Sequence, residues 1–212
     1  MTAQNPVTAP AELRITIYDQ AHLPREVTRS AFDQLRIVLH QSGIAIELVA
    51  GDPAADEASL FTYPGLPPKG REQEAACRAR RDIALKINDI SPPGVPETVL
   101  GIAAPLALTG LNVRVFNQHI REAAFRHNRP YATVLAYAIA HEIGHVLLRS
   151  DAHDKWGLMS SVWREREYAQ MTDAPVMFFT LDESKRMLMN LRGMQCRNVV
   201  FARSAEVNRA VR

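Results

Sequence analysis

The residues His141-Glu142-Ile143-Gly144-His145 lie inside an uninterrupted apolar run. The run begins after Pro130 and contains no further proline or turn signal, which predicts a helix over residues 131–149. Positions i and i+4 share one face of a helix, so His141 and His145 lie on the same side. Both imidazoles can therefore reach one metal ion, with Glu142 beside them to hold a water molecule. A helix that serves only the core has no use for these polar residues, so the pattern predicts a zinc site.

Composition limits the kinds of partner that the chain can have. Its 212 residues suffice for one domain, or for two small subdomains around a cleft. Apolar residues make up 47% and charged residues 23%, as in ordinary globular proteins. The net charge of +2 argues against a nucleic-acid partner. No window offers the about 20 apolar residues that cross a membrane, so no membrane partner is expected.

The N-terminus and the two cysteines say little about the compartment. Residues 1–10 have no basic start followed by an apolar block, so no signal peptide is expected. The protein is then cytoplasmic, unless this chain is a mature form whose signal has been removed. Cys77 and Cys196 permit one disulfide without requiring it, and neither has the neighbouring cysteine of a zinc-binding CxxC motif. The oligomeric state is not indicated.

Apolar periodicity predicts an α+β fold. Alternating residues predict strands at 13–18, 44–50, 82–88 and 111–116, with a further apolar strand at 98–104. Helical spacing predicts helices at 24–41, 131–149 and 181–191, with an amphipathic segment at 162–169 and a short helix or loop at 119–128. Prolines and glycines make 51–70 a long loop. We expect a twisted, mixed five-stranded sheet with one backing helix and the metal-binding helix.

The third metal ligand is open from spacing alone. A catalytic zinc uses three protein ligands and keeps one position for water. Asp151 follows the first histidine by ten residues and His153 by twelve. Glu165 follows the second histidine by twenty residues, the spacing at which a second helix supplies a glutamate in thermolysin-like enzymes.

The stretch from His141 to His153, followed by Gly157-Leu158-Met159, resembles a bacterial group of metzincin-like zinc peptidases. That group reads HEIGHLLLG, then a third histidine, then GIM. The resemblance covers most of residues 13–192, and its specific part is 141–159. It implies a zincin fold, one catalytic Zn²⁺, and a methionine turn (Met-turn) beneath the metal.

The resemblance also assigns roles to individual residues. It implies that His141, His145 and His153 bind the zinc ion and that Glu142 is the general base. It implies that Met159 is the methionine of the Met-turn. It makes strand 98–104 the edge on which a peptide substrate lies, with these substrate-binding residues: Leu100, Gly101 and Ile102.

The chain departs from the pattern of this group just after the helix. Arg149 stands where the group has glycine, and Asp154-Lys155 replaces a serine. Leu148 stands where standard metzincins have glycine, so the chain is expected to turn later and to use His153 as the ligand. Asp151 is then expected to accept a hydrogen bond from a ligand histidine. An Asp151 ligand has a parallel in snapalysin-like enzymes.

The expected organisation has four parts: a flexible segment 1–12, an N-terminal subdomain 13–149, a C-terminal subdomain 150–196 with the Met-turn and the final helix, and an exposed tail 197–212. Among the other aromatic residues, Trp156 and Trp163 are expected to pack beside the Met-turn. Tyr168 is expected at an ordinary amphipathic position, and His119 and His127 at the surface.

The expected function is a zinc-dependent endopeptidase with peptide or protein substrates. Two alternatives stay open. One is a zinc-containing binding module without turnover, and the other is a zinc hydrolase that acts on a non-peptide substrate.

Overall fold

The computed structural model describes residues 11–54, 82–105, 111–172, 174 and 176–193. Cys77, Cys196, most of the loop 51–70 and the tail 197–212 lie outside these residues. The elements, in chain order, are β1 (Ala11–Asp19), α1 (Arg25–Gln41), β2 (Ile44–Ala50), β3 (Asp82–Asn88), β4 (Gly101–Ala103), β5 (Leu111–Phe116), α4 (Asn117–Arg126), α5 (Tyr131–Leu148), α6 (Glu165–Ala169) and α7 (Leu181–Gly193).

The five strands form one mixed sheet in the order β2-β1-β3-β5-β4. Four strands are parallel, and β4 runs antiparallel to β5 at the edge. The predicted five-stranded α+β fold is therefore confirmed. Two expected bounds are corrected. Ala11 and Glu12 belong to β1 rather than to a flexible segment, and the strand expected at 98–104 is reduced to Gly101–Ala103.

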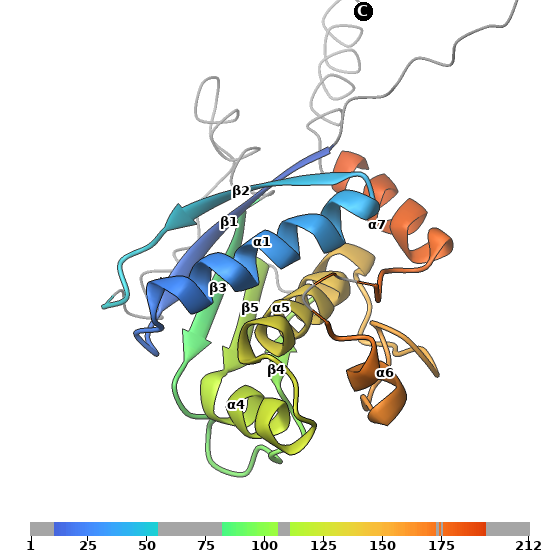
Figure 1. Cartoon of the computed structure of the whole chain (residues 1–212). Coiled ribbons are helices and arrows are strands. Elements are labelled where there is room, and N and C mark those ends of the chain that lie inside the picture. Colours follow the sequence, from blue (N-terminus) through green and yellow to red (C-terminus); the bar gives the residue numbers. More distant parts are fainter. Residues whose placement is uncertain (1–10, 55–81, 106–110, 173, 175, 194–212) are drawn as a thin grey trace, which may run out of the picture.

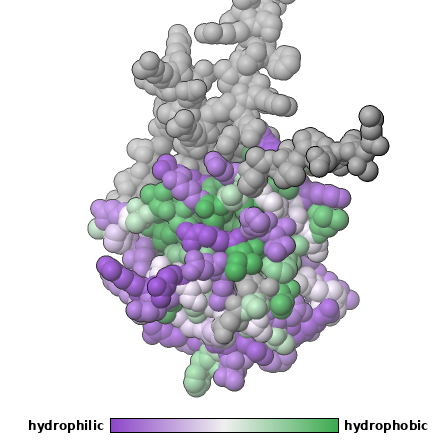
Figure 2. All heavy atoms as spheres, turned by 45° about the horizontal axis from the view of Figure 1, so that its top comes forward, coloured by the Kyte–Doolittle hydropathy of each residue, from purple (hydrophilic) through white to green (hydrophobic). Residues whose placement is uncertain are grey.

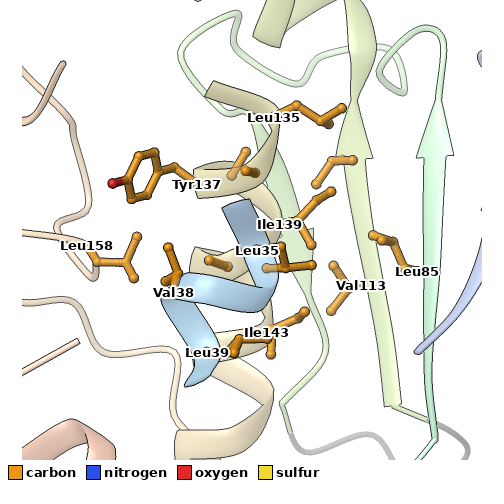
Figure 3. Packing of buried hydrophobic residues seen from close by; sticks show 14 of the residues in the cluster. Leu35, Val38, Leu39, Leu85, Val113, Leu135, Tyr137, Ile139, Ile143 and Leu158 are labelled. Atoms are coloured by element: carbon orange, nitrogen blue, oxygen red, sulfur yellow. The ribbon is translucent and has the colours of Figure 1, made fainter. Parts of the chain in front are cut away.

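Helices α1 and α5 lie side by side on one face of the sheet (Figure 1). Alternation along the strands directs Leu13, Ile15, Leu85 and Val113 into this interface, where each is fully buried. Figure 3 shows side chains of α1 meeting α5, with Leu85 and Val113 of the sheet facing them. Hydrophobic burial of this layer holds α5 in place against the sheet.

Helix α5 is buried nearly all round, and this is why its sequence is apolar on every face. By length and composition it could cross a membrane, but 83% of its residues are buried inside the protein. The buried hydrogen bond from Gln34 Nε2 to Thr133 Oγ1 joins it to α1. It is therefore the core helix of this fold.

The central strand β3 is covered on both faces. Its apolar residues Ile83, Leu85 and Ile87 are fully buried, as the alternation predicts. Lys86, whose side chain points to the opposite face, is only 1% exposed. Figure 2 shows one face of the molecule, on which hydrophilic residues surround a gathering of hydrophobic ones.

The C-terminal elements join the same core. Met171, Met177, Phe179, Met187 and Leu191 are buried in the hydrophobic cluster that contains α5. Helix α7 begins with a capping box, in which Thr180 N donates to the Glu183 carboxylate and Glu183 N donates to the Thr180 hydroxyl. The segment after α5 is thereby folded back towards the histidines of that helix.

Candidate metal centre

Helix α5 presents His141, Glu142 and His145 in its last three turns. The helix ends at Arg149, which adopts a left-handed conformation with φ 53°. This is the conformation that glycine adopts most readily, so the arginine stands at a glycine-like turn. The turn directs the following loop back over the histidine-bearing face.

Three imidazoles converge on one point beside the helix. The Nε2 atom of His145 lies 3.0 Å from Nε2 of His141 and 3.2 Å from Nε2 of His153. These histidines form a group whose possible ligand atoms all lie within 4.8 Å of one another. The structure thus brings together the three histidines that the sequence singled out.

The other ring nitrogens fix the protonation of two of these rings. Nδ1 of His141 donates to the carbonyl of Leu158 at 2.7 Å, and Nδ1 of His145 donates to the carbonyl of Ser150 at 2.8 Å. A carbonyl can only accept, so in the neutral rings both Nε2 atoms carry lone pairs. Two lone pairs 3.0 Å apart repel each other, and a cation bound by both nitrogens relieves that repulsion.

The donor set and its spacing fit zinc. Imidazole bonds of about 2.0–2.1 Å in a tetrahedral site require nitrogen separations of about 3.3–3.4 Å, close to those present. Burial lowers the pKa of His141 to about 4, against the opposing hydrogen bond to Leu158, and burial also lowers the pKa of His145. Burial thus favours the neutral form of both imidazoles, which is the form that binds metals.

The other two candidate ligands are not members of this cluster. Asp151 is exposed, and within the described part of the chain it makes no hydrogen bond to a histidine of the cluster. The backbone carbonyls of Ser150 and Leu158 accept the bonds that the sequence analysis assigned to Asp151. Glu165 accepts a hydrogen bond from Nδ1 of His127 at 2.7 Å and is no member of the cluster.

Glu142 is buried beside the cluster, with 7% of its surface exposed. Burial raises the pKa of its carboxyl to about 8. A cation held by the adjacent histidines would lower that pKa again, because it favours the charged carboxylate. The carboxyl packs directly on β4: a Cβ atom added at Gly101 would lie 3.0 Å from Glu142 Oε1 and 2.7 Å from the Arg114 carbonyl oxygen.

Met159 lies beneath the histidines in a closed turn. The Asp154 amide donates to the Met159 carbonyl at 2.8 Å, and Gly157 has the positive φ of 84° that the turn requires. A Cβ atom added at Gly144 would lie 2.5 Å from the Met159 sulfur and 2.7 Å from the Phe179 ring. The glycine between the two α5 histidines therefore lets the turn approach the helix.

A cavity of about 480 Å³ opens over the cluster. The expected substrate-binding residues Leu100, Gly101 and Ile102 line one side of it. Three lining residues were not expected there: His127, Trp163 and Tyr168. No local motif marks them, so only the amphipathic pattern of 162–169 pointed towards two of the three, Trp163 and Tyr168.

Several aromatic side chains lie differently from the sequence-based expectation. His119 is 6% exposed and hydrogen-bonds to the Val99 carbonyl and the Ser91 hydroxyl, so the prediction of a surface position was wrong. His127 is likewise a cavity residue rather than a surface one. Trp156, expected to pack beside the Met-turn, is 50% exposed between Lys155 and Arg166.

No protein-family model and no curated protein matches the sequence. Solved structures do match the fold. Archaemetzincin from Methanopyrus kandleri aligns with a TM-score of 0.51 and 17% identity, over 88% of this chain and 98% of its own. A zinc-dependent peptidase from Methanocorpusculum labreanum aligns with a TM-score of 0.51 and 16% identity, over 82% and 99%. Metalloproteinase-II from Bacteroides fragilis aligns at 0.51 and 14%, over 85% of this chain and 53% of that one. The chain therefore has a zinc-metallopeptidase-like fold.

Proposed function

We propose that this protein is a zinc-dependent endopeptidase of the metzincin-like type, with Glu142 as general base. The observation that carries the proposal is the convergence of three Nε2 atoms beside a buried carboxyl. They lie at the floor of a cavity bordered by β4, the last strand of the sheet. A structural zinc site closes with a fourth protein ligand and has no need of such a carboxyl.

His141, His145 and His153 would hold the metal. Zinc, when bound there, supplies positive charge that acidifies water and stabilises negative charge on a carbonyl oxygen. Glu142 accepts the proton of the attacking water and then delivers it to the amine that leaves. Its burial keeps bulk water from competing for that proton.

Strand β4 would hold the substrate. It is the last strand of the sheet, and its outer edge has no neighbouring strand among the described residues. An extended peptide can add to such an edge by backbone hydrogen bonds, which leaves its side chains to be read by pockets. Because Gly101 of β4 contacts Glu142, a peptide along this edge passes the general base.

The test compares wild-type protein with Glu142→Gln on an unfolded protein substrate. We expect wild type to cleave it, and the variant to lose a factor of about 10²–10⁴ in rate while it binds zinc in the same stoichiometry. Glu47→Gln, at an exposed position of β2, is the matched control.

Wild type that binds zinc without cleaving any substrate is a binding module. Cleavage of esters or amides but of no peptide indicates the non-peptide hydrolase. Either result contradicts the proposal.

A further inference from the structure

The cavity continues past the histidine cluster to the C-terminal end of α4. Ala123 and His127 line it there, and α5 adds Ala138, one turn before His141. Both alanines are buried, and their small side chains leave space at this end. The whole cavity, at about 480 Å³, is in the size range of sites that enclose a small molecule or one or two residues.

Aromatic rings form one wall of this space. Trp163 stands edge-on to His141, with ring centres 5.7 Å apart, and edge-on to Tyr168 at 6.2 Å. The His127 ring lies flat on Tyr168, with centres 3.8 Å apart and planes 9° from parallel. The Trp163 indole also donates to the Leu158 carbonyl that holds His141. The wall is therefore tied to the metal cluster and kept rigid.

His127 adds a polar group to this wall. Its Nδ1 donates to Glu165 at 2.7 Å, and within the described residues no group hydrogen-bonds to its Nε2. An imidazole whose Nδ1 donates to a carboxylate keeps Nε2 for another partner, as an acceptor in the neutral ring and as a donor in the charged ring. The side chain is 18% exposed and lines the cavity, so a ligand in the cavity can reach it.

We propose that this end of the cavity is a specificity pocket for a side chain that flanks the scissile bond, and that it selects tyrosine. The proposal rests on the proposed function. A tyrosine ring fits a space with alanines on one side and aromatic rings on the other, where ring contacts add to hydrophobic burial. Its hydroxyl both donates and accepts, so it can form the hydrogen bond that His127 Nε2 lacks among the described residues. His127 is then a specificity-determining residue.

The experiment measures kcat/KM of the zinc-loaded enzyme on matched peptides that carry tyrosine, phenylalanine or alanine beside the cleaved bond. We expect tyrosine to exceed alanine by at least about tenfold. It should exceed phenylalanine by about two- to tenfold, the usual contribution of one hydrogen bond. His127→Phe keeps a flat ring but no acceptor, so the tyrosine-to-phenylalanine ratio should fall to one or below.

Two further variants keep the test decisive. Glu165 is 82% exposed, so Glu165→Ala leaves the core intact. It frees Nδ1 of His127 and should also lower the tyrosine-to-phenylalanine ratio. His40→Phe, at an exposed position of α1, should leave the ratio unchanged. Affinities of the same peptides for Glu142→Gln, measured by calorimetry, should show the same order without turnover.

Failure of the proposed function and failure of the specificity pocket give different results. If zinc-loaded wild type cleaves no peptide, the proposed function fails, and the specificity pocket fails with it. If peptides are cleaved but tyrosine is not preferred, the inference alone is wrong. The inference is also wrong if the tyrosine-to-phenylalanine ratio persists in both His127→Phe and Glu165→Ala.

Discussion

At the scale of single residues, position relative to the metal cluster decides which side chains matter. His153 is exposed, yet its Nε2 lies 3.2 Å from that of His145. Asp151, only two residues earlier, acts on His145 through charge alone, since it raises the pKa of that ring without a hydrogen bond. Neighbouring loop residues thus contribute very differently to metal binding.

We predict that His153→Ala removes most of the zinc affinity and all peptide turnover, because it deletes one of three ligands. Asp151→Asn should weaken zinc binding by less than about tenfold, the lower end of losses caused by residues that support ligands. Zinc titration against a competing chelator measures both. Loss of zinc in Asp151→Asn with retention in His153→Ala would reverse the ligand assignment and favour a snapalysin-like site.

We predict that Gly101→Ala lowers kcat about 10- to 100-fold while zinc content stays unchanged. The new Cβ would stand 2.8 Å from Glu142 Cγ, so the carboxyl or the strand must shift. Displacement of a catalytic group by about 1 Å can cost a factor of about 100. Steady-state kinetics and elemental analysis check this. A variant with wild-type kcat would show that Glu142 is not held by β4.

At the scale of elements, the two ends of α5 set the geometry of the site. Its first residue, Tyr131, donates to Asn117 Oδ1 and so joins α5 to α4. Its last turn is closed by Arg149, whose left-handed backbone starts the loop that returns His153 to the cluster. Substitutions at either end of α5 therefore test what holds this helix in position.

Arg149→Gly should stabilise the fold by about 0.5–1 kcal/mol. Relief of the left-handed conformation is worth about 1–2 kcal/mol, and the greater freedom of glycine in the unfolded chain offsets part of it. The free energy of unfolding in urea measures the gain. Arg36→Gly, at an exposed position within α1, should instead lose about 1 kcal/mol. Equal losses of unfolding free energy in Arg149→Gly and Arg36→Gly would contradict a role for the left-handed turn.

Tyr131 should make the fold sensitive to alkali. Burial raises the pKa of its phenol from 10.0 to about 12, with smaller and opposing effects from nearby charges. Above pH 10 the unfolded chain releases this proton while the folded chain retains it, so stability falls as pH rises towards 12. In Tyr131→Phe the decline should be shallower. If the unfolding free energies of wild type and Tyr131→Phe decline in parallel from pH 9 to pH 12, the Tyr131 phenol makes no such contribution.

At the scale of the whole molecule, one hydrophobic core supports the metal centre from both sides. Residues of the sheet, α1 and α5 share it with Leu158, Met159 and Phe179 from the chain beyond α5. The histidines of α5 and the loop that carries His153 are therefore linked through a common core, and a metal held by all three histidines would link them again. Metal binding should consequently stabilise the entire fold.

Zinc removal should lower the melting temperature of the wild-type protein. A ligand that binds only the folded state adds about 4 kcal/mol when its free concentration is a thousand times Kd. Calorimetry with and without chelator should show the shift, and hydrogen exchange should show faster opening of residues 150–160. His141→Ala is the control and should melt equally with and without zinc. Equal melting of the wild type in both conditions would mean that the cluster binds no zinc in the folded state.

Much of the fold was predictable because its signals are local. The strands 44–50, 82–88 and 111–116 coincide with β2, β3 and β5, since alternation along a strand records one buried face. Helix α5 was predicted to within one residue. The short edge strand was overestimated at 98–104, because apolar character does not reveal where hydrogen bonding to a neighbouring strand stops.

The sequence alone places His141 and His145 on one helix face, with Glu142 next to them in the chain, because helical periodicity acts within a few residues. The tertiary structure alone decided which later groups meet them. Backbone carbonyls of Ser150 and Leu158, rather than a side chain, orient the ligand rings. His127 and Tyr168 come together from α4 and α6. Such contacts depend on how whole elements pack around a shared core, and no short-range pattern in the chain records that packing.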